Sequence, residues 1–128
     1  MDQRNLMDIQ KSEFGNTEFH ILIAKNDFKN LKNKIDQLDD PLIIFNNALD
    51  KISNSLLHKA VFSGNLKICK FLIEKKHQVN CVNIFGQSPL HIAYINNNTN
   101  IIKLLIESGA SHDIRDIYNN LPTNFGNL

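Results

Sequence analysis

Cysteines are scarce in this sequence and long apolar runs are absent, and each shortage excludes a class of protein. The 128 residues include two cysteines, Cys69 and Cys81, too few for a disulfide framework, which favours a reducing compartment. No apolar run approaches the ~20 residues of a membrane-spanning helix. Residues 1–5 also lack the basic and then apolar pattern of a secretory signal. We therefore expect a cytoplasmic protein without a membrane partner.

A large excess of one charge is missing as well. Fourteen Lys and Arg residues face thirteen Asp and Glu residues, which leaves a formal net charge of +1. Direct binding to nucleic acid depends on a basic excess, so we expect no nucleic-acid partner. With 42% hydrophobic and 21% charged residues, the chain has the composition of one compact domain rather than of a disordered segment.

An internal repeat is the most informative feature that is present. The segment Ser-Leu-Leu-His-Lys-Ala at residues 55–60 returns at an offset of 33 as Ser-Pro-Leu-His-Ile-Ala at residues 88–93. The same offset relates Asp50 to Asn83 and Asn83 to Asp116, which places three turn-forming residues in one register. A fixed period of this length indicates a stack of repeated units.

The repeat extends upstream with a longer spacing. The segment Phe-Gly-Asn-Thr-Glu-Phe-His at residues 14–20 aligns with residues 52–58, at an offset of 38 rather than 33. We expect the five surplus residues within residues 37–47, around the helix-stopping Pro41. The sequence thus predicts a single domain over residues 1–128, with units at about 14–49, 50–82 and 83–115 and a partial unit at 116–128.

Within each unit the pattern predicts a turn, a short helix, a tight loop and a second helix. Ser88 can cap the first helix and Pro89 suits its first position, while Asn98 or Thr99 can cap the second. Residues 101–106 carry an apolar stripe at helical spacing. Neither helix can bury its apolar face alone, so neighbouring units must stack and share a core. The predicted fold is an all-α solenoid with protruding turns and no sheet.

Motifs for catalysis or cofactor binding are not found. The sequence has no GxGxxG, no P-loop and no GxSxG. Cys69, His77 and Cys81 invite a zinc site, but they lack a closely spaced ligand pair. Cys69 also falls on an apolar stripe, where a buried free thiol is the better interpretation. We expect no enzyme activity, no cofactor and no metal.

Residues 88–93, Gly86, the Gly109-Ala110 pair and the period of 33 together resemble the ankyrin repeat. The resemblance covers roughly residues 14–126 and implies an ankyrin solenoid. It also implies that the repeated histidines His20, His58 and His91 bond to nearby hydroxyl and backbone groups rather than act as bases. One departure is Lys76-His77, which replaces the usual Gly-Ala pair.

In ankyrin stacks the turn tips and the exposed side of the first helices line a concave binding surface. Carried over by position, the resemblance implies eleven partner-binding residues: Lys51, Ile52, Ile84, Phe85, Gln87, Ile117 and Tyr118 at the turns, and Phe62, Ser63, Ile95 and Asn96 on the helices. Apolar residues that recur at solvent-facing tips indicate an interface, with Phe62, Phe85 and Tyr118 as aromatic anchors. The alternative is that some tip residues fold back onto the neighbouring turn.

Two segments resemble particular groups within the ankyrin-repeat family. Residues 14–20 are similar to the first repeat of the vankyrins, small IκB-like ankyrin proteins of polydnaviruses, and residues 58–66 resemble the IκB group. This resemblance implies binding to NF-κB/Rel factors in the host-cell cytoplasm or nucleus. Residues 1–14 contain no Asp-Ser-Gly-x-x-Ser degradation motif and no acidic tail follows residue 124, which implies constitutive suppression of host immune signalling. The alternative is a generic ankyrin scaffold or host-directed effector that binds an unrelated protein.

Overall fold

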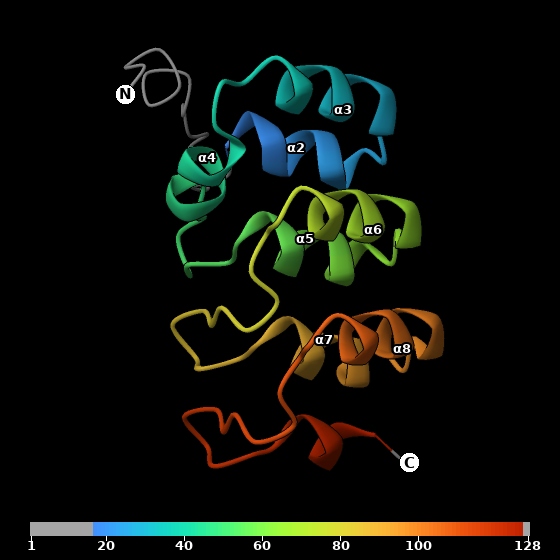
Figure 1. The fold of residues 1–128 in the computed structure, drawn as a ribbon. Helices are drawn as coiled ribbons and strands as arrows, with labels where there is room; N and C mark the ends of the chain where they lie inside the picture. Colours follow the sequence, from blue (N-terminus) through green and yellow to red (C-terminus); the bar gives the residue numbers. More distant parts are fainter. Residues whose placement is uncertain (1–16, 127–128) are drawn as a thin grey trace.

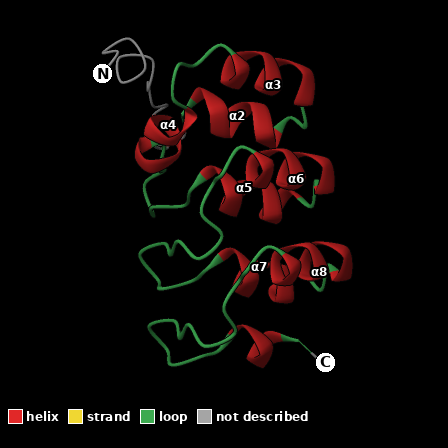
Figure 2. Ribbon diagram, in the orientation of Figure 1, coloured by secondary structure: helices red, strands yellow, loops and turns green. Residues whose placement is uncertain are grey.

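The computed structural model describes residues 17–126, which form helices and loops without a strand. In chain order the elements are α2 (Glu18–Ala24), α3 (Phe28–Asp36), α4 (Pro41–Asn47), α5 (Leu56–Ser63), α6 (Leu66–Glu74), α7 (Pro89–Ile95), α8 (Thr99–Glu107) and the 3-10 helix η1 (Pro122–Phe125). Figure 2 shows long loops between the helix pairs. None of the described helices is long and apolar enough to cross a membrane.

The helices stack in two layers (Figure 1). Helices α2, α5 and α7 form the first layer, and η1 continues it by packing on α7. Helices α3, α6 and α8 form the second layer, each packed against its partner in the first. The loops that precede α5, α7 and η1 protrude to one side of the stack. The prediction of an all-α solenoid of helix pairs is therefore confirmed.

Side-chain caps fix where the helices begin. The Ser88 hydroxyl accepts a hydrogen bond from the backbone N–H of His91, and Pro89 occupies the first helical position. Ser55 caps α5 in the same way. For α8, the sequence left Asn98 and Thr99 as candidate caps. The cap is Asn98, whose side chain accepts a hydrogen bond from the Ile101 N–H. Each cap satisfies a backbone donor that lacks an intrahelical partner.

The core runs along the interface between the layers. Leu31, Ile68, Leu72, Ile101 and Leu105 of the second layer are all fully buried. Burying one such side chain contributes about 1.5–3 kcal/mol relative to leaving it exposed. Because each helix pair shares this core with its neighbours, the stack stabilises the pairs together rather than one by one.

Helix α4 accounts for most of the segment expected to hold the surplus residues. Pro41 is at the first turn of this helix, so the expectation that it stops a helix is wrong: it begins one. The helix is anchored by Phe45, whose ring centroid lies 4.7 Å from that of His77. The surplus residues thus belong to a segment that forms an added helix.

Lys76 occupies a backbone conformation that favours glycine. Its φ of 73° is left-handed, as is the φ of 98° at Gly109, the equivalent position in the next repeat. A residue with a Cβ is strained in this region by about 1–2 kcal/mol. The departure seen in the sequence, Lys76-His77 in place of Gly-Ala, therefore keeps the backbone geometry of the repeat at a cost in stability.

Candidate protein-binding surface

The protruding turns are built around three equivalent polar residues. In each turn, a side-chain oxygen of Asp50, Asn83 or Asp116 accepts hydrogen bonds from the backbone N–H groups two and four residues later, at 2.8–3.1 Å. Short polar side chains of this kind hold a turn by replacing backbone partners. The repeat register found in the sequence thus corresponds to three turns of the same internal structure.

Successive turns are joined to one another by their backbones. The Ile84 N–H donates to the Ile52 carbonyl at 2.9 Å, and the Ile117 N–H donates to the Phe85 carbonyl at 2.9 Å. Gly86 has a φ of 72°, and a Cβ there would lie 3.1 Å from the backbone of the next turn. Because the turns approach this closely, their tips form one connected edge rather than independent loops.

The repeated histidines tie each unit to the next. The Nδ1 atom of His58 accepts from the Ser55 N–H at 3.2 Å and from its hydroxyl at 2.8 Å, while Nε2–H donates to the Gln87 carbonyl at 2.8 Å. His20 and His91 make the equivalent bonds, each with Nε2 2.9 Å from a carbonyl of the following turn. These contacts support the structural role that the resemblance implied. They also include a long-range hydrogen bond from Nε2 to the following turn, which the resemblance did not imply.

Burial keeps His58 neutral. Desolvation lowers the pKa of its imidazole from 6.5 to about 4, although the hydrogen bond to Gln87 opposes the shift. Both ring nitrogens already have protein partners, so this ring has no free nitrogen to offer a substrate. A general base needs both reach and a pKa near the working pH, and His58 has neither.

The cysteines and His77 do not form a metal centre. Cys69 is fully buried, and desolvation raises the pKa of its thiol to about 12. Burial also raises the pKa of the Cys81 thiol, whose Sγ lies 3.4 Å from the Ser55 hydroxyl. Within residues 17–126, no three His, Cys, Asp or Glu side chains come together as metal ligands. The described residues therefore offer no zinc-type group, and their thiols are poor nucleophiles.

The first-layer helices present large apolar side chains to solvent. Phe62 at the end of α5 is 66% exposed, and Ile95 at the end of α7 is 47% exposed. The two helix ends are joined by the Asn96 side chain, whose Nδ2 donates to the Phe62 carbonyl at 3.3 Å. The Lys59 Nζ lies 5.8 Å from the Phe62 ring centroid, within range of a cation–π contact.

The turn tips add exposed apolar side chains at the same spacing. Ile84 is 55% exposed, Ile117 is 59% exposed and Tyr118 is 73% exposed. Isolated exposed apolar residues are ordinary on protein surfaces, whereas a series repeated along one rigid edge indicates an interaction site.

The eleven predicted binding residues divide into two groups. Three of them, Ser63, Phe85 and Gln87, are partly buried, and the other eight are exposed: Lys51, Ile52, Phe62, Ile84, Ile95, Asn96, Ile117 and Tyr118. Gln87 serves the fold, since its carbonyl accepts from His58 and its Oε1 accepts from the Asn83 side chain. Phe85 is less open to solvent than a free turn tip was expected to be.

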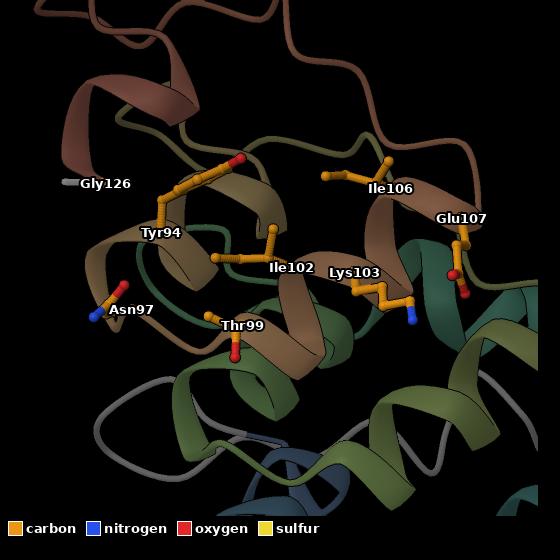
Figure 3. A pocket seen from close by; sticks show the side chains of 8 residues that line it. All are labelled: Tyr94, Asn97, Thr99, Ile102, Lys103, Ile106, Glu107 and Gly126. Atoms are coloured by element: carbon orange, nitrogen blue, oxygen red, sulfur yellow. The ribbon is translucent and has the colours of Figure 1, made fainter.

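Sequence reasoning missed Ile21 and an apolar cleft. Ile21 on α2 is 37% exposed. Its exposure was predictable, because the equivalent position in the next repeat is Lys59, and lysine side chains are rarely buried. The cleft has a volume of about 490 Å³ and lies beside α7 and α8, at the C-terminal end of the stack (Figure 3). Its eight lining residues are Tyr94, Asn97, Thr99, Ile102, Lys103, Ile106, Glu107 and Gly126.

Comparison with known protein families agrees with the repeated helix pairs and turns of this structure. A family model described as ankyrin repeats, in three copies, matches residues 5–116. The start of this match and residues 14–16 of the opening motif lie outside the described residues, as do residues 127–128. No curated protein is similar enough to the chain to be named as a relative. Ankyrin repeats are scaffolds for protein–protein interaction, and this chain belongs to the ankyrin-repeat family.

Proposed function

We propose that this protein binds its partner through the side of the stack formed by the turn tips and the first-layer helices. The inner stripe, as we name it, consists of Phe62, Ile84, Ile95, Ile117 and Tyr118. The observation that carries the proposal is the recurrence of exposed large apolar side chains in the turns and in the first-layer helices, at the repeat period of the fold. A stripe of this kind offers the aromatic and aliphatic anchors on which most binding energy depends in protein interfaces.

The stripe is pre-organised for binding. Backbone bonds between turns and the bond from Asn96 to the Phe62 carbonyl hold its members in place before a partner arrives. Rigid anchors lose little conformational entropy on association, so more of the contact energy appears as affinity. Lysines beside the stripe, Lys51 at a tip and Lys59 next to Phe62, favour a partner with apolar residues flanked by acidic ones.

The partner that we propose is a Rel-homology transcription factor, held inactive in the cytoplasm or nucleus of a host cell. This assignment is supported by the resemblance of residues 14–20 to vankyrins and of residues 58–66 to the IκB group. A partner that is unrelated to Rel factors would make the chain a scaffold or effector of another kind, acting through the same stripe.

A titration against a purified Rel-homology domain tests the surface and the partner together. The double variant Phe62→Ser/Tyr118→Ser should bind more weakly by about 2 kcal/mol or more, roughly thirtyfold, because it removes two exposed aromatic anchors. Leu42→Ser is the matched control, since Leu42 lies on α4, is not one of the stripe residues and is 43% exposed. Circular dichroism should show unchanged helicity in both variants.

The outcomes separate the two parts of the proposal. In a mobility-shift assay the wild-type chain and the Leu42→Ser variant should keep the Rel factor off DNA, and the double variant should release it. If the control loses binding while the double variant keeps it, the stripe is the wrong surface. If the wild-type chain binds no Rel-homology domain, the partner is wrong, and the stripe can then be tested only with another protein.

A further inference from the structure

Among the described residues, no further helix packs on the outer face of α8. Helix α6 packs between α3 and α8, whereas α8 packs on α6 from one side only among the described helices. Ile102 and Ile106 of α8 are equivalent to Cys69 and Ile73 of α6, one repeat earlier. Cys69 is fully buried and Ile73 is partly buried, but Ile106 is 38% exposed. The outer face of α8 therefore presents two apolar positions that lie at an internal interface in α6, with Ile102 partly buried and Ile106 exposed.

Tyr94, Ile102 and Ile106 turn this face into a cleft rather than a flat patch. Figure 3 shows their side chains around the hollow, with Gly126 at one edge and the side chains of Lys103 and Glu107, which also line the cleft, farther along α8. The place corresponds to the one that α8 itself takes on α6, so its shape suits an α-helix.

The charges on α8 indicate which helix fits. Lys103 and Glu107 are one helical turn apart, both are exposed, and neither takes part in an ion pair within residues 17–126. When two copies of α8 meet in antiparallel orientation, Lys103 of each copy faces Glu107 of the other. The same register places Ile102 of each copy next to Ile106 of the other, so apolar and charged positions match at once.

We propose that the outer face of α8 is a self-association surface, on which two copies of this chain pack α8 against α8 about a two-fold axis. A two-fold interface requires a patch that is complementary to itself, and the α8 face meets this requirement.

The opposite end of the stack is a poor match for this face. Ile21 and Leu22 of α2 line a cleft at this end, but its second-layer helix α3 presents Asn30, Asn33 and Lys34 there. The Lys34 Nζ is paired with a carboxylate oxygen of Glu18 at 3.2 Å. Head-to-tail stacking would set these polar side chains of α3 against Ile102 and Ile106, leaving polar groups without partners. The association should therefore stop at a dimer rather than continue into a filament.

Charge swapping tests this proposal. Sedimentation equilibrium of the full chain, from about 1 μM to about 1 mM, should show a monomer–dimer equilibrium. Lys103→Glu and Glu107→Lys should each raise the dimer dissociation constant by about tenfold or more, because each creates two like-charge contacts across the axis. The combined variant Lys103→Glu/Glu107→Lys should restore it to within about threefold of the wild type. Lys70→Glu on α6, at the position equivalent to Lys103 in the preceding repeat, is the matched control and should leave the dissociation constant unchanged.

Several outcomes would overturn the proposal. These are a wild-type chain that stays monomeric over the whole range, masses that grow beyond the dimer, a dimer indifferent to both single variants, and a double variant that fails to restore association. Thermal denaturation of each variant should confirm that the folded state is retained, so that a weaker dimer reflects the surface alone.

Discussion

Acidification from pH 7 to pH 5 should destabilise this protein, because burial in the folded chain lowers the pKa of His58 and His77. Desolvation lowers the pKa of His58 from 6.5 to about 4 and the pKa of His77 from 6.5 to about 4. A proton on the His58 Nδ1 would displace the hydrogen bonds from Ser55. A proton on the His77 Nε2 would be buried without a partner among the described residues. Both rings therefore take up protons more readily in the unfolded chain.

The size and sign of the effect follow from this difference in pKa. Between pH 6.5 and pH 4 the unfolded state binds more protons than the folded state, so the free energy of unfolding falls as the pH falls. The contribution is fully present above the unfolded pKa and is lost progressively toward pH 4. At pH 5 each histidine costs about 2 kcal/mol, or about 4 kcal/mol for the pair. Domains of this size are stable by about 5–15 kcal/mol, so the loss is a large share of the total.

Urea denaturation at pH 7 and pH 5 measures this loss directly. His77→Leu provides the matched test, since it places an apolar side chain of similar size beside Phe45 and removes one of these two imidazoles. The variant should lose about half as much stability between the two pH values as the wild type. An unfolding midpoint that is the same at both pH values in the wild type would refute the assignment of two neutral buried imidazoles.

Two further predictions concern stability. Leu105→Ala should lower the free energy of unfolding by about 2–5 kcal/mol in guanidinium denaturation, because Leu105 of α8 is fully buried and its truncation leaves a cavity. An unchanged midpoint would mean that the repeat register is wrong. Lys76→Gly should raise stability by about 0.5–1 kcal/mol, because it relieves a left-handed residue at the cost of extra freedom in the unfolded chain. A lower Tm for this variant would contradict the strain assigned to Lys76.

The repeat period predicted most of the architecture because it reports both local structure and packing. Ser88 and Asn98 were identifiable as caps since their side chains act within their own helix turn. Helix α4 was not predicted, because Pro41 is as compatible with the end of one helix as with the start of the next. Its placement depends on the contact of Phe45 with His77, which belongs to the next repeat unit, and no local pattern reveals that contact.

The binding surface was predictable only in part, for the same reason. Phe62 and Tyr118 could be placed because their exposure follows from the register of the helices and turns. The partial burial of Phe85 could not be foreseen, since it depends on how closely one turn approaches the next. The sequence placed Ile102 and Ile106 in an apolar stripe. It did not reveal that both side chains line an open cleft in the folded chain.

Mapping the partner contact by amide NMR tests the central claim that the inner stripe carries recognition. Addition of an unlabelled Rel-homology domain to the labelled chain should shift or broaden the amide signals of Phe62, Ile84, Ile95, Ile117 and Tyr118. Signals from the solvent-facing side of α6 should stay in place. Saturable changes confined to the outer helices, with the stripe unaffected, would contradict the account.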